Sequence, residues 1–281
     1  MSSYIIPLHS SNKFVLNKGF VKLVDCMPRI ISLDQKKLMC DSAIVQAARV
    51  SYGQGFKNYE TDSKLINYLF KHKHTSPFEM VKFKFHVKAP IFVARQWFRH
   101  RMGNYNEISG RYSELKDDIY IPDKVSSQSI INKQLSADDN LLALSNDTLK
   151  NLLLDANKYN KLQYNTYENL MKEGVSREIA RINLPLSLYT EFYFSIDLHN
   201  LLNFIKLRNS KNAQHEIKEY ASAIQAIIEP LCPITMKAYN DHKTVTLSKN
   251  QIKALDVFSF KFSKLSKREQ SELEELLNNN I

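Results

Sequence analysis

Strict alternation of apolar and polar residues marks one strand in the first third of the chain. Between positions 81 and 88 the odd positions are valine or phenylalanine and the even positions are lysine or histidine. This period of two is typical of a half-buried strand in an antiparallel sheet. The aromatic stretch 188–195 is also prone to form a strand.

Helical spacing of apolar residues governs most of the remaining chain. Capping residues, glycines and prolines set the ends of the expected helices. Many helices with few strands predict an α+β fold, in which long helices flank an antiparallel sheet. The expected helices are 41–50, one starting at Thr61 or Asp62 and reaching Phe70, 91–98 after Pro90, 149–172 before Gly174, one from Ser176 to Pro185, 198–207 after Asp197, and 213–228.

Two segments differ from this pattern. Residues 122–148 are rich in serine, asparagine and aspartate, which predicts a polar insertion with one short helix. Beyond residue 242, positions 248–251 and 266–269 each fit a capping box, so two short helices are expected there. We therefore expect a main domain at 1–242 and a helical C-terminal extension at 243–281. The simplest interpretation of the extension is an appendage that packs on the domain or a segment that contacts a partner.

Composition limits the class of protein. The chain has 281 residues, 43% of them hydrophobic, and a formal charge of +10, so a packed core and anionic partners are expected. Charge alone does not separate nucleotides from nucleic acid. Apolar runs fall short of the roughly 18 residues of a membrane span, and the start of the sequence lacks a secretory pattern, so we expect a cytoplasmic protein without membrane contact.

Cysteine and glycine usage narrows the chemistry. Cys26, Cys40 and Cys232 lack metal spacing, which favours reduced structural thiols. His72 and His74 have no third ligand in view, so no metal site is expected. The six glycines form no GxGxxG or GxxxxGK[ST] loop. Side chains and helix ends must therefore hold any phosphate.

Residues 95–113, with the sequence RQWFRHRMGNYNEISGRYS, concentrate the candidate chemistry. Arg99, His100 and Arg101 are followed, after seven residues, by Ser109, Gly110 and Arg111. Guanidinium groups match phosphate oxygens two at a time, so this cluster predicts a pocket for a phosphorylated small molecule. We interpret Ser109 as a hydrogen-bonding ligand, because its sequence neighbours offer no base and orienting partner for a nucleophile.

The same stretch resembles the RHR-x7-S signature of the flavin-dependent thymidylate synthases, the ThyX type, and the similarity runs from about residue 18 to about residue 241. The resemblance implies a catalytic domain that converts dUMP to dTMP by reductive methylation. Methylenetetrahydrofolate supplies the carbon, and FAD reduced by NADPH supplies the hydride. It also implies a homotetramer with active sites at subunit junctions.

The resemblance further implies roles for individual residues. Arg111 and Arg181 correspond to a phosphate clamp, Arg208 to an arginine that favours ionisation at N3 of the uracil, and His74 to a histidine near folate and flavin; Arg208 and His74 are the implied catalytic residues. The dUMP ligands would be Gln96, Arg99, Glu107, Ser109, Gly110, Arg111, Arg181 and Arg208. The FAD ligands would be Ser51, Ser76, Glu79, Arg99, His100, Arg101, Asn106, Glu107, Asp197, His199 and Asn203.

Two other interpretations stay open. A nucleic-acid-binding protein could use the same arginines on phosphates and nearby aromatic rings on bases, although acidic residues such as Glu107 and Glu114 interrupt the basic ones. An inactive nucleotide-binding relative is the other, because Asp197 and His199 stand where the family often has asparagine and arginine. For Arg181, pairing with Glu178 or Glu173 is the structural alternative to a phosphate contact.

Overall fold

The computed structural model describes residues 3–8, 12–50, 53, 55–122, 125–128, 136–141, 147–210 and 212–242. The chain divides into two compact units, Met1–Asn240 and Asp241–Ile281. The helices expected within 243–281 lie outside the described residues, so the description below concerns the first unit. Within the described ranges, no helix is both long enough and apolar enough to cross a membrane.

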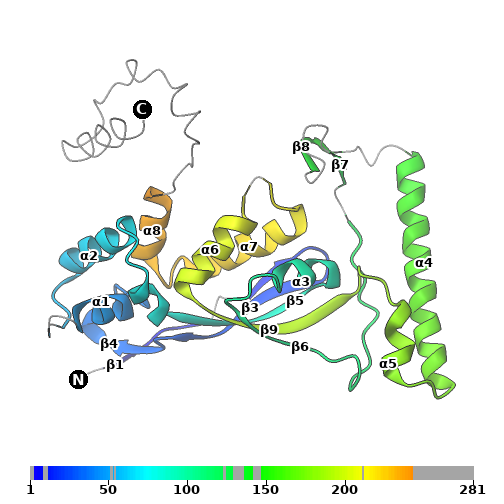
Figure 1. Cartoon of the computed structure of the whole chain (residues 1–281), viewed down its shortest axis with the longest axis horizontal. Helices are drawn as coiled ribbons and strands as arrows, with labels where there is room; N and C mark the ends of the chain where they lie inside the picture. The colour runs from blue at the N-terminus through cyan, green and yellow to red at the C-terminus, as the bar shows by residue number, and fades with distance from the viewer. Residues whose placement is uncertain are drawn as a thin grey trace. The chain divides into compact units, whose positions relative to one another are not determined.

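An antiparallel sheet of five strands forms the centre of the first unit (Figure 1). The strands β5 (Lys82–Pro90) and β9 (Tyr189–Asp197) pair along their whole length, which confirms both predicted strands. Phe85 of β5 lies opposite Phe194 of β9 in this register, so their side chains share one face of the sheet. In order across the sheet, the strands are β2 (Asn12–Val15), β3 (Gly19–Met27), β5, β9 and β6 (Asn104–Glu107).

Three helices cover the apolar face of this sheet. They are α3 (Ile91–Trp97), α6 (Leu198–Arg208) and α7 (His215–Ile228), as Figure 1 shows. Lys82 and Lys84 on the opposite face are exposed, as expected for a solvated lysine face. Lys88 is an exception because it is half-buried and its ammonium group bonds to Asp118 at 2.5 Å.

Trp97 joins the sheet to all three helices. Its side chain is fully buried at the C-terminal end of α3. The indole lies edge-on to Phe192 and Phe194 of β9, with ring centroids 5.3 and 5.6 Å away. It also packs against Phe204 of α6 at 5.0 Å and Tyr220 of α7 at 5.7 Å. Because buried aromatic rings contribute large apolar areas, this cluster holds the C-terminal end of α3 against the sheet and against α6 and α7.

The remaining described elements lie at the two ends of the sheet (Figure 1). One end holds β1 (Ser3–Ile5), β4 (Ile30–Ser32), the 3-10 helix η1 (Leu33–Gln35), α1 (Asp41–Val50), α2 (Tyr59–Lys71), the 3-10 helix η2 (Ser76–Met80) and α8 (Pro233–Asp241). The other end holds α4 (Asp147–Lys172), α5 (Arg177–Ala180) and the 3-10 helix η3 (Arg181–Asn183).

One predicted helix cap needs correction. Asn58 caps α2 through a bond from the Thr61 amide at 2.9 Å, so neither Thr61 nor Asp62 is the cap. Asp62 is instead fully buried and forms an ion pair with Arg49. In the insertion, the described residues form two short paired strands, β7 (Ser126–Gln128) and β8 (Ser136–Leu141), and residues 147–148 already belong to α4. The short helix expected in this segment is not among these strands, and the rest of the segment lies outside the described residues. Asp197 caps α6, as predicted.

The three cysteines are free and buried, as the sequence predicted. The Sγ atoms of Cys26 and Cys40 both donate to the carbonyl oxygen of Pro28, at 3.5 and 3.7 Å. Hydrogen bonding between these two thiols, followed by burial, raises the pKa of Cys26. Burial raises the pKa of Cys232 to about 11. The thiols therefore stay protonated at neutral pH.

A glycine substitution tests the packing that follows α3. A Cβ atom on Gly103 would overlap the buried ring of Phe194. We expect Gly103→Ala to lower the free energy of unfolding by about 1–3 kcal/mol, as overpacking does. Gly55→Ala is the matched control, because its Cβ would meet open space, and it should stay within about 0.5 kcal/mol. Denaturant unfolding at fixed protein concentration measures both, and equal stability of the two variants would contradict this packing.

Candidate active site

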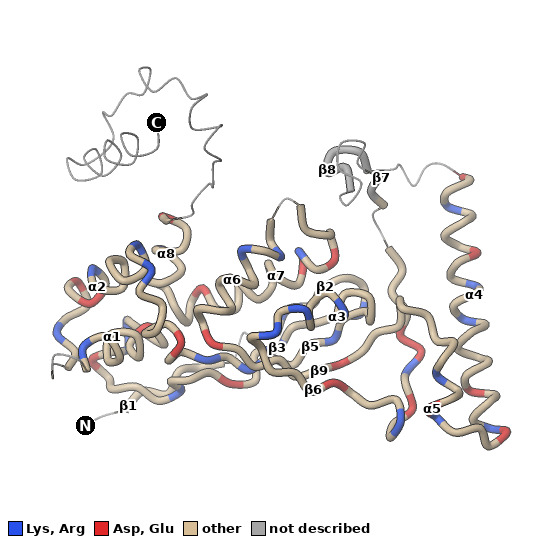
Figure 2. Tube along the Cα trace, viewed as in Figure 1, with Lys and Arg blue, Asp and Glu red and all other residues tan. Residues whose placement is uncertain are grey.

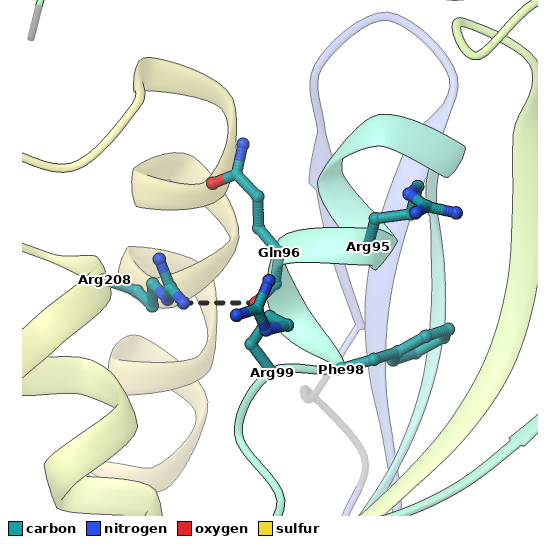
Figure 3. Close-up of a pocket in the computed structure, with 5 residues that line it drawn as sticks. All are labelled: Arg95, Gln96, Phe98, Arg99 and Arg208. Carbon is teal, nitrogen blue, oxygen red and sulfur yellow. Dashed lines mark hydrogen bonds between the residues drawn. The ribbon is translucent and has the colours of Figure 1, made fainter. Parts of the chain in front are cut away.

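A cavity of about 640 Å³ opens where the end of α3 meets the end of α6 (Figure 3). Its lining residues are Arg95, Gln96, Phe98, Arg99 and Arg208, and we call it the α3–α6 pocket. Three of the five carry guanidinium groups, and none carries a carboxylate. A cavity lined in this way favours an anionic ligand.

Arg208 is held along one edge of its guanidinium group. Its Nε donates to Nε2 of His100 at 2.7 Å, and its Nη2 donates to the main-chain oxygen of Gln96 at 3.1 Å. Figure 3 shows Arg208 reaching from the end of α6 to the last turn of α3. Partial burial, and then the charge of Arg99, lower the pKa of Arg208. An arginine remains cationic under these conditions because its ordinary pKa lies so high.

His100 is neutral in this arrangement. Burial, and then the charge of Arg208, lower its pKa to about 4. Its ring lies edge-on to Phe204, with centroids 4.8 Å apart, and its carbonyl oxygen accepts a bond from the Tyr105 hydroxyl at 2.8 Å. Arg208 and Phe204 therefore hold the imidazole beside the pocket, and Tyr105 holds the backbone of the same residue.

Two polar partners of the site residues were not predicted from the sequence. The side chain of Gln96 donates to Gln214, which stands at the N-cap of α7. The buried hydroxyl of Thr190 donates to the Glu107 carboxylate at 2.6 Å. Neither pair is close in sequence, so only the pairing of strands and helices could reveal them.

A second group of predicted site residues gathers around α5. The side chain of Arg181 lies over Gly110, where an added Cβ would stand 3.2 Å from its Cδ atom. Nε of Arg111 pairs with Glu178 at 3.2 Å, and the Arg111 amide donates to Oγ of Ser109 at 3.3 Å. We call Ser109, Gly110, Arg111, Glu178 and Arg181 the α5 cluster. Among the described residues Arg181 itself forms no ion pair, so its alternative partners Glu178 and Glu173 do not hold it.

The two groups lie apart in one chain, because α5 lies beside α4 at one end of the sheet, whereas α3 and α6 cover its middle (Figure 1). In the part of the chain that the structure describes, no hydrogen bond or ion pair links the α3–α6 pocket to the α5 cluster. Asn106 and Glu107 lie between them on strand β6 and line a smaller depression of about 290 Å³ beside His86, Glu191 and Tyr193. The predicted dUMP ligands therefore divide between two places in the monomer.

The other predicted flavin residues lie near η2 and along α6. Ser76 and Glu79 belong to η2, which contacts α6. Asp197, His199 and Asn203 lie at the start of α6 or within it, and both carboxylate oxygens of Asp197 bond to Asn200, at 2.9 and 2.8 Å. His74 is exposed just before η2, Arg101 is exposed just after α3, and Ser51 lies outside the described residues.

Charge on the described chain is mixed. Figure 2 shows acidic and basic positions interspersed along α4 and along the segment after β6. In the described ranges the basic positions do not form one continuous stripe along an element. A basic patch or stripe on one face is the usual electrostatic signature of a nucleic-acid-binding protein.

Comparison with known proteins gives matches over most of the chain. A family model described as thymidylate synthase complementing protein matches residues 35–234. A flavin-dependent thymidylate synthase of Thermus thermophilus is 50% identical over 247 residues, which cover 86% of this chain and 83% of that protein. One from Dictyostelium discoideum is 44% identical over 265 residues, covering 93% and 84%.

A solved structure agrees in fold. The crystal structure of the UMP/dUMP methylase PolB from Streptomyces cacaoi, bound with 5-Br dUMP, superposes with a TM-score of 0.68 at 27% identity, covering 81% of this chain and 97% of that one. The fold and the site thus define an α+β protein whose main described pocket is lined by cationic side chains. The chain belongs to the flavin-dependent thymidylate synthase family.

The protonation of His100 provides a test that needs no ligand. We expect the ring to carry its proton on Nδ1 and to stay neutral until the pH falls to about 4. Selective histidine labelling and NMR titration measure both properties, and the His100→Gln variant assigns the signal by its loss. Since the folded-state pKa lies below the ordinary 6.5, the associated stability is complete above that pH and is lost as the pH falls toward 4. A His100 midpoint near 6.5 would contradict the Arg208 contact.

Proposed function

We infer that this chain is a flavin-dependent thymidylate synthase, a methyltransferase that converts dUMP to dTMP by reductive methylation. Methylenetetrahydrofolate is the carbon donor, and NADPH reduces the FAD that acts as hydride source. Family membership supports this activity, and the observation that carries it at the site is the cluster of Arg99 and Arg208 at one cavity. We propose residues 1–242 as the catalytic domain and 243–281 as an extension of unassigned role.

For dUMP, we propose that the α3–α6 pocket holds the uracil and the α5 cluster holds the phosphate. Arg208 faces the pocket with a permanent positive charge, which stabilises negative charge on the uracil ring when N3 ionises. Arg111 and Arg181 offer the bidentate geometry that phosphate oxygens prefer. The full set of proposed dUMP ligands is Gln96, Arg99, Glu107, Ser109, Gly110, Arg111, Arg181 and Arg208.

For FAD, the chemistry of the available donors fits the group. The exposed guanidinium groups of Arg99 and Arg101 suit a diphosphate in a sequence that has no glycine-rich phosphate loop. Bound FAD supplies the hydride, while the protein positions and encloses it. His74 is proposed next to folate and flavin. The remaining proposed FAD ligands are Ser51, Ser76, Glu79, His100, Asn106, Glu107, Asp197, His199 and Asn203.

We propose that the enzyme is a homotetramer whose active sites combine residues from different subunits. The separation of the α3–α6 pocket from the α5 cluster supports this proposal, since one nucleotide has to contact both. Helix α4 supports it further, because Tyr167 is its only described buried residue, while Leu152, Tyr159 and Leu162 are each more than 60% exposed. Exposed apolar side chains in such number favour burial against another protein surface.

We propose the cytoplasm as the place of action. The direct test of the activity is simple. Purified protein should be yellow, and dUMP with methylenetetrahydrofolate should make it consume NADPH and release dTMP. A colourless protein that still binds dUMP would point to an inactive relative. A colourless protein with steeply salt-dependent DNA affinity would point to nucleic-acid binding.

The proposed phosphate clamp can be tested by substituting Arg181 and, as a control, the nearby Arg177. We expect Arg181→Ala to raise the KM for dUMP by about 10–100-fold, the effect of losing a charge-assisted hydrogen bond. Arg177→Ala is the matched control, because Arg177 begins the adjoining helix α5 but pairs with Glu114 at 3.2 Å. Steady-state kinetics on the FAD-loaded enzyme measure both. Equal KM values for the two variants would contradict the clamp.

Shared active sites can be tested by complementation. Arg208→Ala and Arg181→Ala should each be weakly active alone. When the two variants are co-expressed with different tags and purified as mixed oligomers, sites that join Arg208 of one subunit to Arg181 of another are intact, so activity should rise above that of either variant. A mixture of the separately purified variants, assayed at once, is the control. No gain in the mixed oligomers would show that both arginines act from one chain.

A further inference from the structure

We propose that His100 is a positioning residue: it fixes the guanidinium group of Arg208 so that the free edge of that group faces the α3–α6 pocket. The proposal rests on the proposed function, in which Arg208 contacts the uracil of dUMP. It assigns His100 a task that acts through another residue, in addition to the flavin contact implied by family resemblance.

The hydrogen-bond geometry carries the proposal. An arginine has two flat edges, one formed by Nε and Nη2 and one formed by Nη1 and Nη2. The first edge is used by His100 at 2.7 Å and by the Gln96 carbonyl at 3.1 Å. Nη1 has no partner among the described residues, so the second edge is available to a ligand. Two parallel N–H groups on that edge match a planar pair of acceptors, such as an ionised ring nitrogen beside a carbonyl oxygen.

The acceptor on His100 determines its chemical state. A guanidinium group can only donate, so Nε2 of His100 has to be the acceptor, and the ring proton has to lie on Nδ1. A protonated imidazole would offer no lone pair and would add a like charge beside Arg208. The contact therefore needs a neutral histidine, and burial of the ring favours that state.

His100 is also rigid enough to orient its partner. The ring rests against Phe204, which belongs to the buried cluster around Trp97. Its backbone is anchored through the Tyr105 hydroxyl, which also donates to the Trp97 carbonyl oxygen at 3.3 Å. A partner held from both sides limits the rotation of Arg208, and pre-oriented groups of this kind bind more tightly because less freedom is lost on binding.

Two matched substitutions both remove the imidazole ring, but only one of them keeps a hydrogen-bond acceptor for Arg208. The side-chain oxygen of glutamine can reach the position of Nε2, whereas that of asparagine stops near the position of Nδ1. We expect FAD-loaded His100→Gln to keep its dUMP dissociation constant within about 3-fold, and His100→Asn to weaken binding by about 10–100-fold, the range for a hydrogen bond to a charged group. If His100→Asn does not fold, the glutamine variant decides alone, and a loss beyond 10-fold there overturns the proposal.

A double-substitution cycle tests whether His100 acts through Arg208. In the Arg208→Ala background, His100→Asn should change dUMP affinity by less than about 3-fold, because the residue that it positions is gone. An equal loss in both backgrounds would mean that His100 contacts the nucleotide or flavin directly, and it would overturn the proposal. Bound FAD, read from the visible spectrum of each variant, reports the flavin contact separately.

The ligand-free protein separates this proposal from the proposed function. In the wild type, His100→Asn should lower the unfolding midpoint by roughly 2–4 °C, the shift for about 1 kcal/mol in a domain of this size. The same substitution should lower it less in Arg208→Ala. A wild-type protein that binds neither FAD nor dUMP would end the proposed function while leaving this coupling measurable. Absence of the coupling would end the positioning proposal even if the enzyme is active.

Discussion

The burial of a single indole ring underlies the geometry of the site. Trp97 fills the space between β9, α6 and α7, and the three arginines of the segment 95–101 lie within four residues of it in sequence. Because dense cores tolerate little displacement, the last turn of α3 has few positions available to it. Arg99, His100 and Arg101 are thus attached directly to the buried aromatic cluster around Trp97. Precision at the pocket derives from apolar packing behind it rather than from the charges themselves.

The pocket concentrates charges of one sign. Arg95, Arg99 and Arg208 line it together, and partial burial, followed by the charge of Arg99, lowers the pKa of Arg208. Like charges at close range oppose each other, so an anion entering the cavity gains both attraction and relief of that repulsion. At the α5 cluster, by contrast, Glu178 already neutralises part of the charge of Arg111. The two regions therefore offer an anionic ligand different electrostatic environments: the lining of the α3–α6 pocket holds no carboxylate, whereas the α5 cluster contains one paired with Arg111.

Sequence patterns predicted the elements that depend only on residues close to one another in the sequence. The alternation at 81–88 and the cap at Asp197 depend on neighbours within a few positions, and both predictions were confirmed. The cap of α2 was predicted wrongly because Asp62 is drawn into the core by Arg49, an influence from another helix. Strands β1 and β4, the helix α8, and the partners Thr190 and Gln214 were missed, since each is defined by a contact with a distant segment. The individual ligand roles stay predictions derived from the family motif.

The reactivity of the three buried thiols reports local opening of the fold. Cys26, Cys40 and Cys232 come from β3, from the residue before α1 and from the residue before α8, so they join three segments that are distant in sequence. Alkylating reagents attack thiolates that reach solvent, and in the closed structure these sulfurs are neither ionised nor accessible. The rate at which these thiols are modified therefore depends on how often the segments that bury them open locally. Because none of the three cysteines is among the proposed ligands of dUMP or FAD, such labelling would report this local opening without modifying a proposed ligand residue.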